Sequence, residues 1–166
     1  MEWSKLNNHQ LGKYGEYFAK MEFTKYGLDV YTAEVDDKGI DLVVRREVGR
    51  YIEVQVKSVR KKNYAFMRKR VFEPRKDFYL ALLIFSDEIT FALIPSREWK
   101  KAARPLFLVD RDYEQGRTAP EYGINLSAQS ISVLQTQYSA QKTLKHFTTS
   151  SLSVEKPVAH RGGQDI

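Results

Sequence analysis

The chain has 166 residues, 42% hydrophobic and 29% charged, a balance typical of a single folded domain rather than of a disordered chain. It contains no cysteine, which excludes disulfides, thiolate metal sites, iron–sulfur clusters and cysteine nucleophiles. No stretch approaches the roughly 18 apolar residues of a membrane span, and residues 1–8 lack the apolar core of a signal sequence. We therefore expect a cytoplasmic protein without membrane contact. The net charge of +6 favours an anionic partner, of which nucleic acid is the commonest.

The first predicted element is a helix, because apolar residues recur at helical spacing and Gly27 is suited to end it. The residues that carry this pattern are Leu11, Tyr14, Phe18, Met21 and Tyr26. Gly12 and Gly15 lie inside the helix, where each costs about 1 kcal/mol relative to alanine. We therefore expect the helix to lie close to another backbone or to a nucleic-acid strand.

Strands dominate the middle of the chain. The predicted strands are 28–31, 40–44, 51–59, 78–85, 89–94, 106–109 and 122–126. The pair 40–44 and 51–59 forms a hairpin with its turn at 47–50. The nearly continuous apolar run 78–85 predicts a strand that is buried on both faces.

Two serines mark helix starts in the second half of the chain. Ser96 follows Pro95 and can cap a short helix, and Ser127 can cap a last helix. Residues 130–134 also alternate like a strand, so both assignments stay open there. We expect one domain over residues 1–147 and a disordered tail over 148–166, where Ser, Thr, Gly and charged residues dominate.

Positive charge is concentrated between residues 45 and 76. This basic segment holds twelve Lys and Arg against three Glu, a net charge of +9, whereas the rest of the chain sums to −3. Tyr64, Phe66 and Phe72 lie among the bases. The pattern predicts a surface that binds along a nucleic-acid backbone and carries aromatic rings able to stack on bases or to insert between them. The alternative is a solvated loop in which a few apolar side chains reach the core.

The hairpin also carries polar groups that suit a metal ion. Strand 51–59 alternates, so that Gln55 and Lys57 share one face. Asp41 lies in an otherwise apolar strand, where a carboxylate is costly to bury without a partner. The hairpin is expected to bring Asp41 near Gln55 and Lys57. A carboxylate and a carbonyl oxygen suit Mg²⁺, and an adjacent lysine can orient or deprotonate a water molecule in phosphodiester hydrolysis. The alternative is an amphipathic strand with one wet face.

This arrangement resembles the PD-(D/E)XK nuclease superfamily, the restriction-endonuclease-like fold, over about residues 10–95. The matching segments are GKYGEYF with Glu16, GIDLVV with Asp41, and EVQVKS with Gln55 and Lys57. The resemblance implies that Glu16, Asp41, Gln55 and Lys57 are catalytic. It further implies that Glu16, Asp41, Gln55 and the backbone carbonyl of Val56 hold Mg²⁺ or Mn²⁺.

Two positions depart from the family pattern. Ile40 replaces the usual proline, which is common in the family. Gln55 replaces the second acidic residue, as in a branch that includes some homing and resolvase-like members, and this removes one negative charge from the metal site. Glu53 lies on the same strand face, and we expect it to pair with the basic surface rather than with metal.

The sequence therefore predicts an α/β fold with a central mixed sheet flanked by helices; the runner-up is a generic α+β domain with an antiparallel sheet. The predicted function is a Mg²⁺-dependent DNA endonuclease, and cutting both strands of a duplex would suit a homodimer. The alternative is a catalytically weak or inactive module of the same fold that binds nucleic acid or a protein partner. The nucleic-acid-binding residues are expected to be Arg60, Lys61, Lys62, Arg68, Lys69 and Arg70. DNA and RNA substrates and their shapes stay open.

Overall fold

The computed structural model describes residues 2–33, 38–60, 64–113 and 118–152. In chain order its elements are η1 (Trp3–Lys5), α1 (Asn8–Lys25), β1 (Asp29–Thr32), β2 (Leu42–Glu47), β3 (Arg50–Arg60), β4 (Tyr64–Arg68), β5 (Phe78–Phe85), β6 (Thr90–Pro95), η2 (Ser96–Lys100), β7 (Leu108–Arg111), β8 (Glu121–Asn125), α2 (Ala128–Gln137) and α3 (Ala140–Leu152). No helix within these ranges is long and apolar enough to cross a membrane.

A five-stranded sheet in the order β1-β2-β3-β5-β6 forms the centre of the fold. Strands β3 and β5 are parallel, and the other neighbouring strands are antiparallel. The sheet is therefore mixed, which confirms the predicted α/β class and excludes the antiparallel alternative. Strand β5 has the predicted bounds, and all its residues except Tyr79 are buried, as its apolar run predicts.

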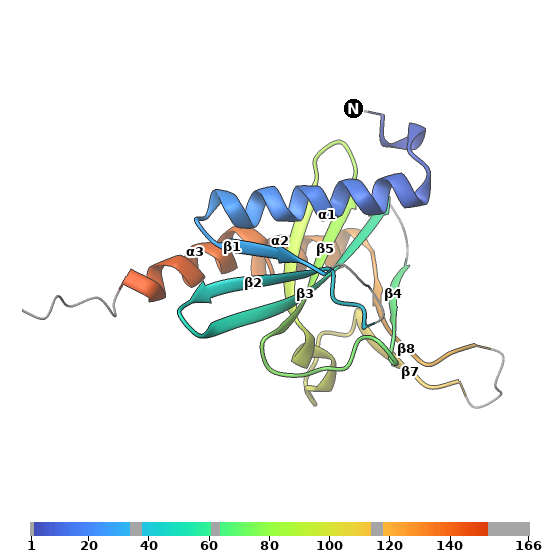
Figure 1. Cartoon of the computed structure of the whole chain (residues 1–166). Helices are drawn as coiled ribbons and strands as arrows, with labels where there is room; N and C mark the ends of the chain where they lie inside the picture. The colour runs from blue at the N-terminus through green and yellow to red at the C-terminus, as the bar shows by residue number, and fades with distance from the viewer. Residues whose placement is uncertain (1, 34–37, 61–63, 114–117, 153–166) are drawn as a thin grey trace, which may run out of the picture.

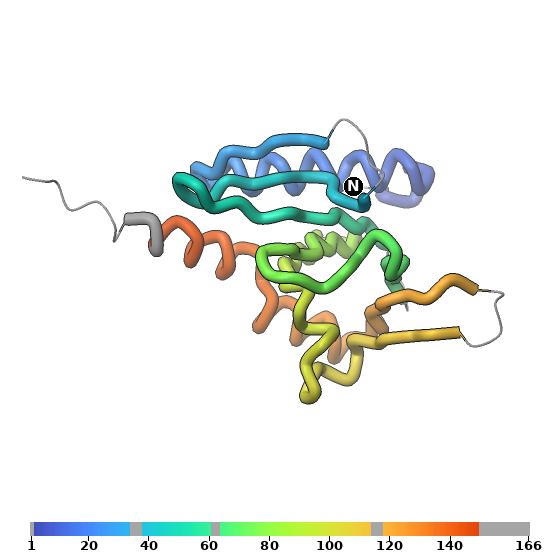
Figure 2. The backbone as a smooth tube through the Cα atoms, turned by 60° about the horizontal axis from the view of Figure 1, so that its bottom comes forward, coloured from blue at the N-terminus to red at the C-terminus, as the bar shows by residue number. Residues whose placement is uncertain are grey.

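The two faces of this sheet are covered by different elements. Helix α1 packs on one face, where Ala19 and Phe23 share one buried core with Ile52 and Val54 of β3, and α3 adds Leu144 to the same core. A second sheet, in the order β4-β8-β7, and helix α2 pack on the other face. Figure 1 shows α1 crossing the central sheet, and Figure 2 shows β7 and β8 on the side away from α1.

Helix α1 begins with a reciprocal cap formed by Asn7 and Gln10. The Asn7 side chain accepts a hydrogen bond from the Gln10 backbone N–H, and the Gln10 side chain accepts one from the Asn7 N–H. Gly27 has a φ of 75° and follows the last helical turn, as predicted. Met21, however, is exposed, because the buried stripe follows a spacing of four: Leu11, Gly15, Ala19 and Phe23.

Gly15 marks the point at which α1 approaches β3 most closely. A Cβ atom at Gly15 would lie 1.9 Å from Ser58 Oγ, whereas one at Gly12 would meet no atom within 4 Å. Gly15 therefore does lie in close contact with the sheet, but the neighbouring atoms belong to the side chains of Ser58 and Leu83 and not to another backbone as expected. At Gly12 nothing within the described ranges requires a glycine.

Three local assignments differ from the sequence prediction. Residues 64–68 form strand β4 rather than loop. Ser96 does not cap a helix, because its hydroxyl bridges the Arg75 backbone by accepting from the N–H and donating to the carbonyl, both at 3.0 Å. Phe72, expected among the surface rings, is fully buried against Phe78 and Trp99.

The C-terminal part of the chain is helical. Ser127 caps α2 in a capping box with Ser130, as predicted, and this settles the open assignment at residues 130–134 in favour of a helix. Helix α3 continues through residues 148–152, where the tail was expected to begin. The remainder of the predicted tail, residues 153–166, lies outside the described residues.

Candidate active site

The β2–β3 hairpin places Asp41 against the middle of β3. Leu42 pairs with Val54 in the antiparallel register, and the Asp41 N–H donates to the Val54 carbonyl at 3.0 Å. One carboxylate oxygen of Asp41, Oδ2, accepts a hydrogen bond of 2.6 Å from the Val56 backbone N–H. This contact fixes the carboxylate beside Gln55 and Lys57, as the predicted hairpin requires.

Gln55 lies under a glycine of the loop that leads into Asp41. Gly39 has a φ of 67°, and a Cβ atom there would lie 2.9 Å from Gln55 Nε2 and 3.0 Å from Val71. A side chain at position 39 would therefore displace the Gln55 amide. The carbonyl oxygen of that amide, Oε1, is buried and accepts no hydrogen bond from the described residues, an arrangement that is costly without a further partner.

Lys57 lies two residues further along the same face of β3. Its ammonium nitrogen is 5.1 Å from the centre of the Phe66 ring on β4. Burial lowers the pKa of Lys57 from its ordinary value of 10.5, and attraction to the Asp41 carboxylate opposes this shift. A larger fraction of Lys57 is therefore neutral at a given pH than of an exposed lysine, and the neutral amine can accept a proton.

Glu16 is placed differently from the other three predicted catalytic residues. It lies on α1, which covers the sheet face opposite to Gln55 and Lys57. Its carboxylate pairs with Lys13 at 2.7 Å. The same Lys13 also interacts electrostatically with Asp41, and both carboxylates raise its pKa. Lys13 thus links Glu16 to Asp41; the sequence signal for it is its position one helical turn before Glu16.

The described part of the chain holds no cluster of three or more His, Asp or Glu side chains able to bind a metal ion. Beside Lys57, the described residues provide the Asp41 carboxylate and the Gln55 amide carbonyl as side-chain oxygen donors. Glu53 is engaged elsewhere, since Arg75 donates to its Oε2 from Nε at 2.8 Å and from Nη2 at 2.5 Å. The expected pairing of Glu53 with the basic segment is therefore confirmed.

A surface hollow lies beside these residues. It is lined by Lys38, Ile40, Arg70, Val71, Glu73 and the Glu53–Arg75 pair. Arg70 is exposed. Because Ile40 immediately precedes Asp41 and Glu53 is two residues from Gln55, an anionic group in this hollow would lie close to the candidate metal ligands.

The predicted nucleic-acid-binding residues fall into three groups. Arg68 and Arg70 are exposed. Arg60 is tied to the N-terminal segment, where its guanidinium donates to the carbonyl oxygens of Trp3 and Leu6. Lys61 and Lys62 lie outside the described residues.

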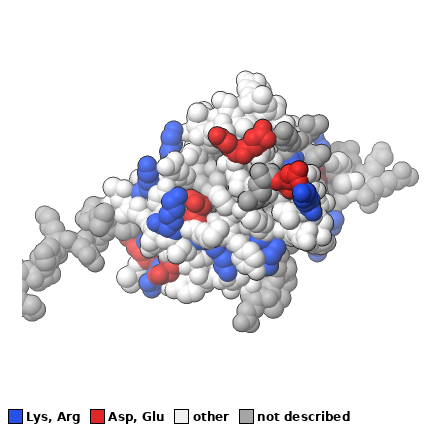
Figure 3. Space-filling view, turned by 90° about the horizontal axis from the view of Figure 1, so that it is seen from above, with Lys and Arg blue, Asp and Glu red and all other residues white. Residues whose placement is uncertain are grey.

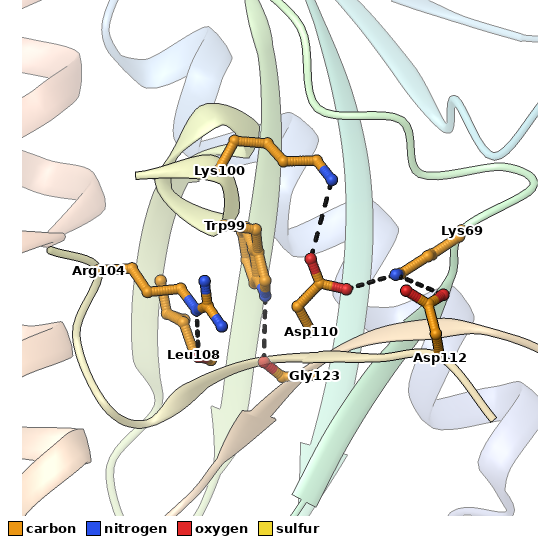
Figure 4. Close-up of polar contacts among 8 residues, drawn as sticks. All are labelled: Lys69, Trp99, Lys100, Arg104, Leu108, Asp110, Asp112 and Gly123. Carbon is orange, nitrogen blue, oxygen red and sulfur yellow. Dashed lines mark hydrogen bonds and ion pairs between the residues drawn. The ribbon is translucent and has the colours of Figure 1, made fainter. Parts of the chain in front are cut away.

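Lys69 belongs to a network of ion pairs within the chain. It pairs with Asp110 and, at 2.8 Å, with Asp112, and Lys100 approaches Asp110 from the other side at 3.8 Å. Figure 4 shows this network beside the Trp99 indole, which donates to the Gly123 carbonyl. Lys69 therefore ties β4 to β7, and its charge already has two carboxylate partners.

Comparison with known proteins bears on the fold of this chain. No protein-family model matches the sequence, and no curated protein matches it. Among solved structures, the chain is similar to Hjc, a Holliday junction resolvase from the archaeon Archaeoglobus fulgidus, with a TM-score of 0.53 and 17% identity over 81% of this chain and 95% of that one. A bacterial homing endonuclease, I-Ssp6803I, matches with a TM-score of 0.46 and 15% identity over 92% of this chain and 100% of that one. The mixed sheet and its helices thus form a restriction-endonuclease-like fold.

Proposed function

We propose that the protein is a divalent-metal-dependent endonuclease that hydrolyses DNA phosphodiester bonds. The observation that carries this proposal is the meeting of Asp41, Gln55 and Lys57 at one point of the β2–β3 hairpin. Nucleases of this fold class need oxygen ligands for a metal ion and a lysine that serves the attacking water, and these three side chains provide both.

The donor set fits Mg²⁺ or Mn²⁺. Both ions prefer oxygen ligands, and the buried Gln55 carbonyl oxygen lacks a hydrogen-bond donor from the described residues. Asp41, Gln55 and the Val56 carbonyl would hold the ion, and Glu16 would contribute through a water molecule. When bound, the ion would lower the pKa of a coordinated water and offset charge on the phosphate.

The remaining chemistry belongs to Lys57. Its neutral form can accept a proton from the attacking water, and its charged form can stabilise the phosphate in the transition state. Because its pKa is lowered, Lys57 populates both its neutral and its charged form at a lower pH than an exposed lysine does.

A nicking assay on supercoiled DNA, with Mg²⁺ and with EDTA, tests this proposal. We expect cleavage that EDTA abolishes and that Asp41→Asn reduces by at least 100-fold, because the substitution removes the carboxylate that lies beside Gln55 and Lys57 among the described residues. Asp87→Asn, which removes an exposed acid outside the site, is the matched control and should cleave like the parent. Cleavage that survives EDTA or Asp41→Asn would overturn the metal mechanism.

Gln55 favours a second candidate function, a binding module with weak or lost catalysis, because it removes a negative charge at a position that is usually acidic in the family. Gln55→Glu separates the two candidates. If the parent is a nuclease whose Gln55 binds metal, calorimetric titration should show tighter Mg²⁺ binding by the variant. A parent that binds DNA without cleaving it, with or without Mg²⁺, would identify the module instead.

A further inference from the structure

We propose that the outer face of the small β4-β8-β7 sheet is a stacking platform for an unpaired nucleobase of the substrate, with Phe66 as its contact ring. This inference rests on the proposed nuclease function and specifies which part of the nucleic acid the site accepts. It begins from the exposure of Phe66, a large apolar ring that remains 40% exposed and lies 5.1 Å from the Lys57 ammonium.

Phe66 belongs to a line of rings and cations along the sheet. Strand β4 alternates, so that Ala65 and Met67 enter the core while Tyr64, Phe66 and Arg68 face outward. The Tyr64 and Phe66 rings lie nearly parallel, with an interplanar angle of 16° and centres 6.4 Å apart. The Arg111 guanidinium lies 4.6 Å from the Tyr64 ring centre. Rings and cations in one line suit an aromatic, phosphate-bearing ligand.

The platform is held rigidly from below. The Tyr64 hydroxyl donates to Glu121 Oε1 at 2.7 Å, and the Tyr113 hydroxyl donates to the same oxygen at 3.1 Å. Gly123 provides the floor, since a Cβ atom there would lie 2.0 Å from the Tyr64 hydroxyl oxygen and 2.3 Å from its ring. The Tyr64 ring is thereby held beside Phe66, so this neighbour loses little conformational entropy when a ligand stacks on Phe66.

The charge of this face selects the ligand. Glu121 is buried beneath the tyrosines and pairs with Arg111 at 3.9 Å, whereas the side chains of Arg68 and Arg111 are exposed, so the accessible charge of these three residues is positive. The platform is also continuous with the active site through the Lys57–Phe66 contact. A nucleic-acid strand whose phosphate reaches Lys57 would therefore bring the base of that nucleotide, or of its neighbour, to Phe66.

The occupant must be unpaired. In a duplex the faces of each base are covered by adjacent base pairs, and only the base edges are accessible in the grooves. A base can lay its face on Phe66 only where stacking is interrupted, as in a single strand, a flap or a junction. We infer that the protein prefers substrates with such an interruption over continuous duplex.

The test compares two DNA ligands in EDTA, where the proposed chemistry cannot proceed. One is a duplex with a single-stranded flap that carries 2-aminopurine at successive unpaired positions, and the other is the continuous duplex. We expect the parent to quench 2-aminopurine at one unpaired position through stacking and to bind the flap more tightly. Phe66→Ala should abolish the quenching and weaken flap binding by about 5- to 150-fold, equivalent to ~1–3 kcal/mol per stacked base, while duplex binding is unchanged.

Two variants serve as controls. Phe66→Trp keeps an aromatic face and should retain both the quenching and the preference. Tyr51→Ala removes a ring of similar exposure, 48%, from the far end of β3, and should behave like the parent. Thermal melts establish that each variant is folded.

The outcomes separate this inference from the function on which it rests. If Phe66→Ala binds the flap like the parent, or loses affinity for flap and duplex equally, the stacking platform is overturned and the nuclease proposal stands. If the parent binds neither ligand and cleaves no DNA with Mg²⁺, the proposed function fails and the platform fails with it.

Discussion

In the proposed mechanism, Lys57 would serve chemistry at the expense of stability. Its ammonium is largely withdrawn from water, and burial lowers its pKa despite the attraction of Asp41. Removing a charge from water is costly unless a partner compensates for the lost hydration. The direction of the pKa shift shows that this compensation is incomplete, so the charged form of Lys57 destabilises the folded protein.

Lys57→Met should therefore stabilise the protein while it removes cleavage. At pH values below its lowered pKa, Lys57 is protonated in both the folded and the unfolded states. There the burial of its charge lowers the free energy of unfolding of the parent. Between that pKa and 10.5 the unfolded chain binds more protons, so the stability of the parent rises with pH. The advantage of Lys57→Met should thus be greatest at neutral pH and shrink as the pH approaches 10.5. Urea unfolding in EDTA across this range measures it.

The accompanying loss of cleavage should be about 10²–10⁴-fold, the usual contribution of a general acid or base. Lys76→Met removes an exposed lysine of the same basic segment and should alter neither stability nor cleavage. A less stable Lys57→Met protein would show that the contact of Lys57 with Phe66 and Asp41 outweighs the cost of burying its charge.

At the scale of secondary structure, the packing of α1 on β3 depends on the absence of a side chain at Gly15. Gly15→Ala would place a methyl group against Ser58 Oγ and 3.3 Å from Ser58 Cβ, and overpacking of this kind typically costs 1–3 kcal/mol. The higher helix propensity of alanine offsets about 1 kcal/mol. We expect a net loss of up to about 2 kcal/mol in the free energy of unfolding, measured by urea titration.

Gly12 provides a matched comparison within the same helix. A Cβ atom there meets no atom within 4 Å, so Gly12→Ala should stabilise the protein by about 1 kcal/mol through helix propensity alone. Adding Ser58→Ala to Gly15→Ala should restore part of the lost stability. Equal effects of the two glycine substitutions would mean that α1 shifts on β3 without cost.

Elements with strong local signals were predictable from the sequence. The apolar run of β5, the hairpin of β2 and β3 and the capping serine of α2 each depend on neighbouring residues, and all three were expected; β2, however, begins at Leu42 rather than Ile40, so Asp41 precedes the strand. Strand β4 was missed because its charged neighbours indicated a loop, although its alternation of outward Tyr64 and Phe66 with inward Ala65 and Met67 is visible in the sequence. The bridging role of Ser96 depends on Arg75, a residue 21 positions away, and no local pattern reveals it.

In the candidate site, the relations within the hairpin were predictable, whereas contacts between distant segments were not. Strand alternation and the hairpin were sufficient to bring Asp41 to Gln55 and Lys57, because these relations follow from register. The engagement of Arg60 with Trp3 and of Lys69 with Asp110 could not be predicted. Such contacts join segments that are distant in the sequence. A count of charges does not distinguish a basic side chain that is ion-paired or hydrogen-bonded from one that is exposed.

At the scale of the whole molecule, the basic segment does not form one continuous surface. Arg50 and Arg60 stand at opposite ends of β3, about 33 Å apart at the usual rise per residue. Arg45 and Arg50 pair with Asp29 and Glu47 at the hairpin end. The side on which α1 lies shows acidic and basic residues interspersed (Figure 3). Within the described part of the basic segment, the exposed cations that form no ion pair with a carboxylate are instead Arg68 and Arg70, on and just after β4.

Salt dependence of DNA binding tests whether this local distribution, rather than total charge, governs affinity. If Arg68 and Arg70 contact phosphates, Arg68→Ala with Arg70→Ala should weaken binding to all sequences and flatten the plot of log K against log salt by roughly 0.9 per contact on duplex DNA. Such contacts affect affinity rather than the chemical step. Lys57→Met should show the converse, with near-parental binding and lost cleavage.

The matched control is Lys142→Ala with Lys145→Ala, which removes the same charge from exposed positions on α3, the helix that packs on the α1 face of the sheet. Both double variants have a net charge of +4 instead of +6, so a long-range effect of total charge would weaken binding equally in the two. We expect the parental salt slope in the α3 variant and a slope smaller by about 1.8 in the Arg68 and Arg70 variant. Identical slopes in parent and arginine variant would show that these arginines do not contact the DNA backbone, and the nucleic-acid surface would then have to be sought elsewhere on the protein.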